Sequence, residues 1–479
     1  MANTTSLDTS AVSTAHVEET HTIAQQFASF AAGLRFDDVP EHVREQAKLL
    51  MLDCIGIALA SGTYGFAKSS EAAVRRLAGD AKGDVTVIGR PYTLPLRDAA
   101  LINGILVHGL DFDDTHPGGV IHSSASAFPT AFTVAENRGR SGAEMILAYV
   151  LGMEVATRIA SAANGGFHAN GFHPTGVVGA FGSTIVASKL NNLPASAIAL
   201  AQGFAGSTAA GAAEFLGTGA WTKRAHPGWA SVCGITSAAM GAEGYETPLT
   251  IYEGRFGLFN NYIDKDHAVD LSMCTDGLGE RWETMAVAVK PFPACHFTHA
   301  FADSALELVK QHGISANDVD SVHCLIASGE VPSVCEPADT KVRPANAYDA
   351  QFSVPYVVSA ALHRNRFTLN ELEDEALNDT QILDLAGRVT YEEDPNSAFP
   401  TYFSGEIRVK TKDGRELVHR EQVNRGAGDR PLSADDIINK FIGNAERALP
   451  ATRVEQIVDA ALQLDTVGNV KDFAALLRG

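Results

Sequence analysis

Four long apolar segments rich in glycine, alanine and serine constrain the fold of this chain more than any other feature. Their apolar residues recur at helical spacing, and they span 142–164, 175–190, 196–213 and 230–241. Because small side chains let helix backbones approach one another closely, this run predicts a tightly packed helical domain. No stretch approaches twenty apolar residues without a polar break, so no membrane-spanning segment is expected.

Strand-like patterns follow after residue 276. The segments with this pattern are 283–290, 320–328, 388–394 and 405–423. The last of them contains Lys412-Asp413-Gly414, a sequence typical of a hairpin turn. Helical patterns at 298–312 and 351–362 lie between these segments, and the chain is helical again from 433 to 477.

We therefore predict a mainly α fold with an inserted α+β domain. A large all-helical domain is built from the N- and C-terminal segments, and the inserted domain forms a smaller lid. The predicted divisions are a disordered tail at 1–20, the first part of the helical domain at 21–283, the α+β lid domain at 284–425 and the C-terminal part of the helical domain at 426–479.

Charge and cysteine usage narrow the choice of partner and compartment. The net charge of −20 argues against nucleic acid or an anionic membrane as a partner. A small anionic substrate would therefore need a local basic pocket. The chain has 6 cysteines but no CxxC pair, and its polar N-terminus lacks the features of a secretory signal, so we expect a cytoplasmic protein.

The segment from Asn103 to Glu136 carries the densest chemistry. Three carboxylates and three imidazoles lie close together in sequence between two apolar stretches. They belong to His108, Asp111, Asp113, Asp114, His116 and His122. A helix continuing through this segment would place Asp111 and Thr115 on one face, and His116-Pro-Gly-Gly would then end it. Either chemistry or a solvated acidic turn capped by its own aspartates would explain such a cluster.

Three later segments add histidines and cations. They contribute His168 and His173 in a glycine-rich loop, Lys223, Arg224 and His226 in a second loop, and Lys290, Cys295, His296 and His299 after a strand-like run. Arg343 could clamp a carboxylate. Structural histidines, a surface basic turn and an interdomain salt bridge remain the alternative interpretations. No metal site, Cys–His hydrolase, P-loop or dinucleotide motif has its expected spacing in this sequence, so we predict no metal and no cofactor.

Five blocks of this sequence, in order, resemble the signature blocks of the MmgE/PrpD family. They are HGLDFDDTH followed by VIH, GFHPTGVVGAFGS, TKRAHPGWA and KPFPACHFTH. The family includes 2-methylcitrate dehydratase, cis-aconitate decarboxylase and iminodisuccinate epimerase. The resemblance implies a helical domain with an inserted lid, usually as a homodimer, that works without metal or organic cofactor. One departure is His116, which stands where a tryptophan often follows the DFDDT block.

The resemblance also implies which side chains carry out the reaction. The family's cleft residues fall on Asp111, Thr115, His122, His173, Lys223 and Lys290. From the chemistry of proton transfer we expect Asp111 and His122 to be the proton-transfer pair, with His173 and Thr115 as further catalytic residues. The side chains expected to bind substrate are Lys223, Lys290, His116, His226 and Arg343. We expect a cofactor-independent lyase, a dehydratase or decarboxylase, acting on a small di- or tricarboxylate by proton transfer next to a carboxylate. The alternatives are an epimerase of an iminodisuccinate-like dicarboxylate and a non-catalytic carboxylate binder.

Overall fold

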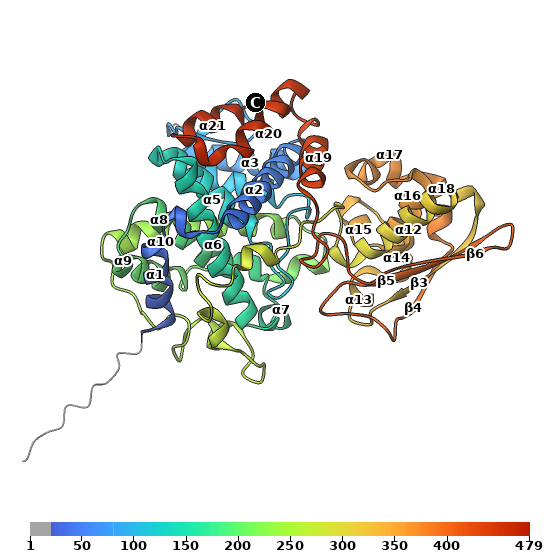
Figure 1. Cartoon of the computed structure of the whole chain (residues 1–479), viewed down its shortest axis with the longest axis horizontal. Coiled ribbons are helices and arrows are strands. Elements are labelled where there is room, and N and C mark those ends of the chain that lie inside the picture. The colour runs from blue at the N-terminus through green and yellow to red at the C-terminus, as the bar shows by residue number, and fades with distance from the viewer. Residues whose placement is uncertain (1–20, 80) are drawn as a thin grey trace, which may run out of the picture.

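The structure, a computed structural model, describes residues 21–79 and 81–479. The tail predicted at 1–20 lies outside the described residues. The chain forms a large helical body and a smaller α+β lobe, which lie side by side in Figure 1. The mainly α, two-part character expected from the sequence is confirmed.

The helical body contains helices from both ends of the chain and one short hairpin. Its elements are α1 (Ile23–Gly33), α2 (Glu41–Ser61), α3 (Gly65–Ala78), β1 (Val85–Thr86), β2 (Thr93–Leu94), α4 (Leu96–Val107), α5 (Ser124–Arg138), α6 (Gly142–Ala162), α7 (Gly166–Ala169), α8 (Pro174–Leu190), α9 (Ala195–Ala205), α10 (Thr222–Ala242), α11 (Leu258–Tyr262), α19 (Ala434–Ala445), α20 (Ala451–Leu462) and α21 (Val470–Leu476). The C-terminal helices lie beside α2 in Figure 1. This packing closes the body with residues from both ends of the chain.

Glycines set how closely the central helices approach. A Cβ atom built on Gly104 of α4 would lie 2.4 Å from the Cα atom of Gly228 on α10. The two backbones could not pack this tightly with larger residues at the crossing. The contact places the first turn of α10 beside the segment that follows α4. The same principle holds α19 on α2, where a Cβ on Gly56 would lie 3.0 Å from the Phe441 ring.

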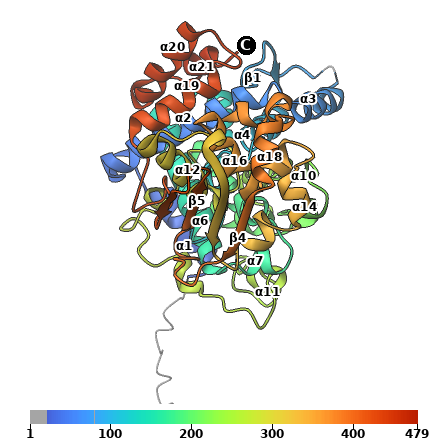
Figure 2. The same cartoon turned by 90° about the vertical axis from the view of Figure 1, so that its right-hand side faces the viewer.

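The α+β lobe is a four-stranded sheet with helices against it. Its elements are α12 (His299–His312), β3 (Val319–Ile326), α13 (Val331–Val334), α14 (Ala338–Val342), α15 (Ala347–Gln351), α16 (Val354–Arg364), α17 (Asp374–Leu377), α18 (Thr380–Ala386), β4 (Val389–Glu393), β5 (Gly405–Thr411) and β6 (Glu416–Glu421). The strand order is β4-β3-β5-β6, with β3 and β4 parallel and the other pairs antiparallel. Figure 2 shows the lobe from the front, with α12, α16 and α18 beside the sheet.

Several elements begin or end elsewhere than the sequence predicts. The strand predicted at 283–290 is wrong: this segment holds a short 3-10 helix (Glu283–Ala286), and only Ala288 forms a bridge, with Thr115. The helix predicted to begin at 230 begins at Thr222 instead, and Pro227 lies inside it. The helix predicted over 196–213 ends at Ala205. Contrary to the sequence reading, α6 is long and apolar enough to cross a membrane, although it is buried in the body as a core helix would be.

Candidate active site

The densest cluster of ionisable groups lies on the loop between α4 and α5. α4 ends at Val107, and Asp111 has a left-handed φ of +51°. The helix that would have aligned Asp111 with Thr115 is therefore absent, and the sequence expectation on this point is wrong. Thr115 and Ala288 instead exchange two backbone hydrogen bonds, each 2.8 Å long. This bridge ties the loop to the segment that carries Lys290.

Two ammonium groups meet at the Asp111 carboxylate. The Lys223 Nζ atom donates to Asp111 Oδ1 at 2.8 Å, and the Lys290 Nζ atom lies 3.3 Å from the same oxygen. Lys290 also donates to the Asp111 carbonyl oxygen at 2.7 Å. Burial alone would raise the pKa of Asp111, but Lys223 and Lys290 outweigh it and hold that pKa well below its usual value. The Asp111 charge in turn raises the pKa of Lys223 against the opposing effect of burial.

His122 faces the ion-paired group of Asp111, Lys223 and Lys290 with a ring nitrogen that makes no hydrogen bond to any described residue. Its Nδ1 atom lies 2.7 Å from the Asp114 carbonyl oxygen, so the ring donates its proton there. The Nε2 atom is left as a lone pair, 3.7 Å from Asp111 Oδ1. Burial lowers the pKa of His122 to about 3, against the opposing charge of Asp113. The imidazole beside the two lysines is therefore neutral at neutral pH. Thr115 Oγ1 lies 3.5 Å from its Nδ1 atom.

Three further imidazoles stack behind His122. His108 Nδ1 lies 2.8 Å from Asp113 Oδ2, and its ring lies 5.6 Å from the ring of His173 in a stacked arrangement. His173 occupies the N-cap position of α8 without a side-chain capping hydrogen bond, and its Nδ1 atom lies 3.0 Å from that of His226. Burial lowers the pKa of His173 well below its usual value and that of His226 to about 4. The His173 and His226 rings are therefore neutral hydrogen-bonding groups at pH 7.

A second layer of buried polar groups supports the loop from the side of the body. Asp114 hydrogen-bonds the Ser124 hydroxyl, and burial raises the pKa of Asp114 to about 7. On the opposite side, Lys440 of α19 donates to Asp53 and to the Phe112 carbonyl oxygen, each at 2.8 Å. These contacts fix the backbone on either side of Asp113, so this layer supports the loop between α4 and α5.

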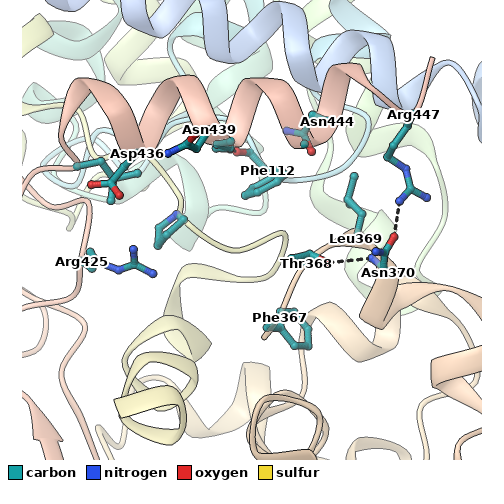
Figure 3. A pocket seen from close by; sticks show the side chains of 14 residues that line it. Phe112, Phe367, Thr368, Leu369, Asn370, Arg425, Asp436, Asn439, Asn444 and Arg447 are labelled. Carbon is teal, nitrogen blue, oxygen red and sulfur yellow. Dashed lines mark hydrogen bonds between the residues drawn. The ribbon is translucent and has the colours of Figure 1, made fainter. Parts of the chain in front are cut away.

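Two cavities are lined by the sequence neighbours of Asp111, although Asp111 itself lines neither of them. A cavity of about 340 Å³ is lined by Leu110, Arg224 and Tyr348, among others. A cavity of about 380 Å³ is lined by Phe112, Arg425 and Lys440, among others. Figure 3 shows the second cavity, with Asp436 and Asn439 of α19 on one side and Phe367 on the other. Both cavities are lined by residues of the body and of the lobe.

Comparison with known proteins identifies the family. The MmgE/PrpD N-terminal domain matches residues 25–269, and the MmgE/PrpD C-terminal domain matches residues 292–465. The chain belongs to the MmgE/PrpD family. It is 28% identical to the cis-aconitate decarboxylase of Mus musculus, over 95% of this chain and 93% of the mouse protein. It is 28% identical to that of Homo sapiens, with 95% of both chains covered, and 25% identical to that of Aspergillus terreus, over 95% of this chain and 96% of the fungal one.

The structure of this MmgE/PrpD protein brings most of the predicted site residues together. The residues in mutual contact are Asp111, Thr115, His122, His173, Lys223, Lys290 and His226. Lys223 and His226 lie on the first turns of α10, not in the loop that the sequence predicted. Their roles in a reaction remain predictions.

Two predicted substrate-binding residues lie outside this group. Both ring nitrogens of His116 are engaged by protein: Nε2 lies 3.1 Å from Glu283 Oε2, and Nδ1 accepts from the Gly119 amide at 3.1 Å. His116 thereby braces the turn of the loop, and it has no free ring nitrogen for a substrate. Arg343 is exposed at the end of α14, and within the described ranges its side chain has no hydrogen bond or ion pair. Its predicted role in binding substrate is untested.

The sequence analysis assigns no role to Tyr348 or Gln351. The Tyr348 hydroxyl is buried without a hydrogen-bond partner in the described part of the chain, and burial raises its pKa to about 12. The Arg224 guanidinium lies over the Tyr348 ring at 5.6 Å. Gln351 donates to the Leu110 carbonyl oxygen at 2.7 Å, which joins the lobe to the loop between α4 and α5. Neither residue stands in a local motif, so only their placement in the fold marks them.

Proposed function

We propose that this MmgE/PrpD protein is a lyase that removes carbon dioxide or water from a small di- or tricarboxylate without metal or organic cofactor. The relatives that match over 95% of the chain are named cis-aconitate decarboxylases, so decarboxylation of cis-aconitate is the first reaction to test. Dehydration of a 2-methylcitrate-like substrate is the alternative lyase reaction. Epimerisation of an iminodisuccinate-like dicarboxylate is the second candidate.

The observation that carries the proposal is the pairing of two lysines on one buried carboxylate. Lys223 and Lys290 both point at Asp111 Oδ1, at 2.8 and 3.3 Å. The chain as a whole carries a net charge of −20, so this is a local concentration of positive charge in an acidic protein. Cations fixed in a site that excludes water stabilise the negative charge that develops on a substrate carboxylate during reaction.

His122 supplies the proton transfer that each of these reactions needs. In decarboxylation of an unsaturated tricarboxylate, the bond to one carboxylate breaks, its electrons form a new double bond, and the original double bond shifts. The far alkene carbon then takes a proton, so one proton is consumed and carbon dioxide leaves. In dehydration, His122 Nε2 would instead remove a proton next to a carboxylate while the hydroxyl leaves as water. A general acid–base group of this kind contributes about 10²–10⁴ in rate.

The binding of a polyanionic substrate would change the protonation of His122. In the empty site burial lowers the His122 pKa to about 3. Substrate carboxylates nearby favour the imidazolium and so raise that pKa. The bound substrate would thereby convert His122 into the acid that protonates it. Thr115 would hold the His122 ring in place, and Asp111 would hold the two lysines. Asp111 itself stays ionised, because Lys223 and Lys290 lower its pKa.

We propose that the α+β lobe acts as the lid of this site, that the protein is a homodimer, and that it works in the cytoplasm. Gln351 and Tyr348 of the lobe line one of the two cavities, which supports a lid. Leu216, Trp221 and Trp229 are large exposed apolar residues around the start of α10, which supports burial by a second copy. Light scattering on the purified chain would measure the oligomeric state.

Product analysis in D₂O decides between the reactions. The full chain is incubated with cis-aconitate, 2-methylcitrate or iminodisuccinate, and carbon dioxide, unsaturated products and deuterium are measured. Release of carbon dioxide identifies a decarboxylase, and loss of water alone a dehydratase. Deuterium incorporation without either identifies an epimerase. The variant Lys223→Met is the control, because it should lose turnover whichever reaction occurs. Binding of all three acids without any product would overturn the proposal in favour of a carboxylate binder.

A further inference from the structure

A group of three histidines beside the two lysines has the arrangement of a metal site. His108, His122 and His173 each bring one ring nitrogen within 4.8 Å of those of the other two. We infer that these three imidazoles bind a divalent transition-metal ion of the zinc class, and that its occupancy inhibits the enzyme. The binding stands by itself, whereas the inhibition rests on the proposed function.

The hydrogen bonds of the three rings leave the same nitrogen free in each. The Nδ1 atoms of His108, His122 and His173 are engaged by Asp113 Oδ2 at 2.8 Å, the Asp114 carbonyl oxygen at 2.7 Å and His226 Nδ1 at 3.0 Å, respectively. The Nε2 atoms of His108 and His122 are therefore lone pairs, because their Nδ1 atoms donate to oxygen. The Nε2 atom of His173 is a lone pair in the tautomer whose Nδ1 atom donates to His226. Metal-binding histidines in proteins are held in this way, with the second ring nitrogen bound to a carboxylate or carbonyl oxygen.

His108 gives a second and independent indication. Its side chain is 1% exposed, and its Nε2 atom has no hydrogen-bond partner among residues 21–79 and 81–479. Leaving a buried polar atom without a hydrogen-bond partner destabilises the folded state. The opposing nitrogen is fixed by Asp113, so the ring cannot turn Nε2 toward another partner without losing that hydrogen bond. A metal ion between the rings would satisfy this nitrogen.

The donor set and the local charge select the kind of ion. Three imidazole nitrogens with an open fourth position suit zinc, copper or nickel and do not suit magnesium or calcium, which prefer oxygen ligands. The Asp111 charge is already shared by Lys223 and Lys290, whereas Asp113 lies directly behind His108 and compensates positive charge there. The alternative group of Asp111, Asp113 and His122 is less suitable, because both carboxylates are committed to these partners.

An ion in this position would block catalysis through His122. The lone pair of His122 Nε2 is the one that faces Asp111, and coordination would remove it from proton transfer. The ion would also bring positive charge toward Lys223, which opposes the ion pair with Asp111. Inhibition should therefore lower kcat and be reversed when a chelator removes the ion.

Cobalt(II) titration of the full-length protein tests the site without any assay of turnover. We expect one ion per chain, with the strong visible absorption of a four-coordinate nitrogen–oxygen site, and displacement by Zn²⁺. The variants His108→Asn and His173→Asn should each weaken Co²⁺ binding by about 10–100-fold or more. His323→Asn is the matched control, because His323 lies on β3 of the lobe and bonds Thr390 instead.

The variant Asp113→Asn keeps the test decisive if a histidine variant fails to fold. It leaves all three ligands in place and should weaken Co²⁺ binding by about 10–100-fold. Undiminished binding in the folded variants would overturn the site, as would a near-ultraviolet thiolate band, which would assign the ion to cysteine. If Co²⁺ binds but Zn²⁺ leaves turnover unchanged, the proposed inhibition is wrong and the proposed metal site still stands. Absence of turnover on every substrate would overturn the proposed function. The Co²⁺ titration would still decide whether the metal site exists.

Discussion

Replacement of Asp111 by asparagine tests the central electrostatic feature of the site. The substitution keeps the shape of the side chain and removes the charge that Lys223 and Lys290 share at 2.8 and 3.3 Å. Lys290 has a 2% exposed side chain, so its ammonium group would remain buried without a counter-charge. Removal of one partner from a buried ion pair costs about 3–5 kcal/mol. We expect Asp111→Asn to lose this amount of unfolding free energy at neutral pH.

The pH dependence of this loss follows from the direction of the pKa shift. The pKa of Asp111 in the folded protein lies well below its ordinary value of 3.8, because Lys223 and Lys290 outweigh the effect of burial. The carboxylate therefore stabilises the folded state fully above that ordinary value, and the stabilisation is lost as the pH falls toward the folded-state pKa. The difference between wild type and Asp111→Asn should be constant from pH 7 to about pH 5 and shrink in more acidic solution.

Urea unfolding of both proteins between pH 3 and pH 7, followed by circular dichroism, measures the difference. The exposed Asp266→Asn is the matched control, because it removes the same charge without an ion pair and should change stability by less than about 0.5 kcal/mol. A loss for Asp111→Asn below about 1 kcal/mol, the range of an exposed ion pair, would refute the reasoning. So would a loss that stays the same at every pH.

Four further predictions concern the reaction and its substrate. His122→Ala should reduce turnover by about 10²-fold or more, and near-normal turnover would remove His122 from the mechanism. Lys290→Ala should chiefly raise KM, and unchanged KM and kcat would count against its binding a substrate carboxylate. Arg343→Ala should leave KM close to wild type, because Arg343 is exposed and apart from the ion-paired group; a rise as large as that of Lys290→Ala would return it to the site. Substrate binding should take up a proton as the His122 pKa rises from about 3, seen by calorimetry as a heat that depends on the buffer, and a buffer-independent heat would contradict this.

Local sequence patterns predict which helices and strands form better than they predict the residues at which these elements begin and end. The hairpin turn at Lys412–Gly414 and the helix start after His173 occur as expected, because short-range backbone preferences decide them. The strand expected at 283–290 fails, because its apolar residues pack around the loop between α4 and α5 and only Ala288 pairs with Thr115. Alternation of apolar residues cannot distinguish such a buried irregular segment from a strand.

The candidate site shows the same difference between what local sequence predicts and what the fold decides. The motif blocks mark Asp111, His122 and Lys223 as residues that belong together, but they do not say which atoms meet. His116 belongs to the same block as Asp111, yet it turns away and bonds Glu283, 167 residues further along the chain. Tyr348 has no motif, yet it lines the cavity beside Arg224. Side-chain direction on an irregular loop depends on what packs against that loop, which periodicity does not encode.

The sequence by itself determines the chemical groups of this protein and its helical composition, because residue identity and short-range periodicity are local properties. It also determines the family, through the order of the motif blocks. Only the tertiary structure decides that two lysines meet at one oxygen of Asp111 and that three imidazoles each bring one ring nitrogen within 4.8 Å of the others. These contacts join residues separated by up to 179 positions, and they depend on close helix crossings such as that of Gly104 with Gly228. The physical reason is that long-range packing, not local preference, sets the distances between charges and lone pairs.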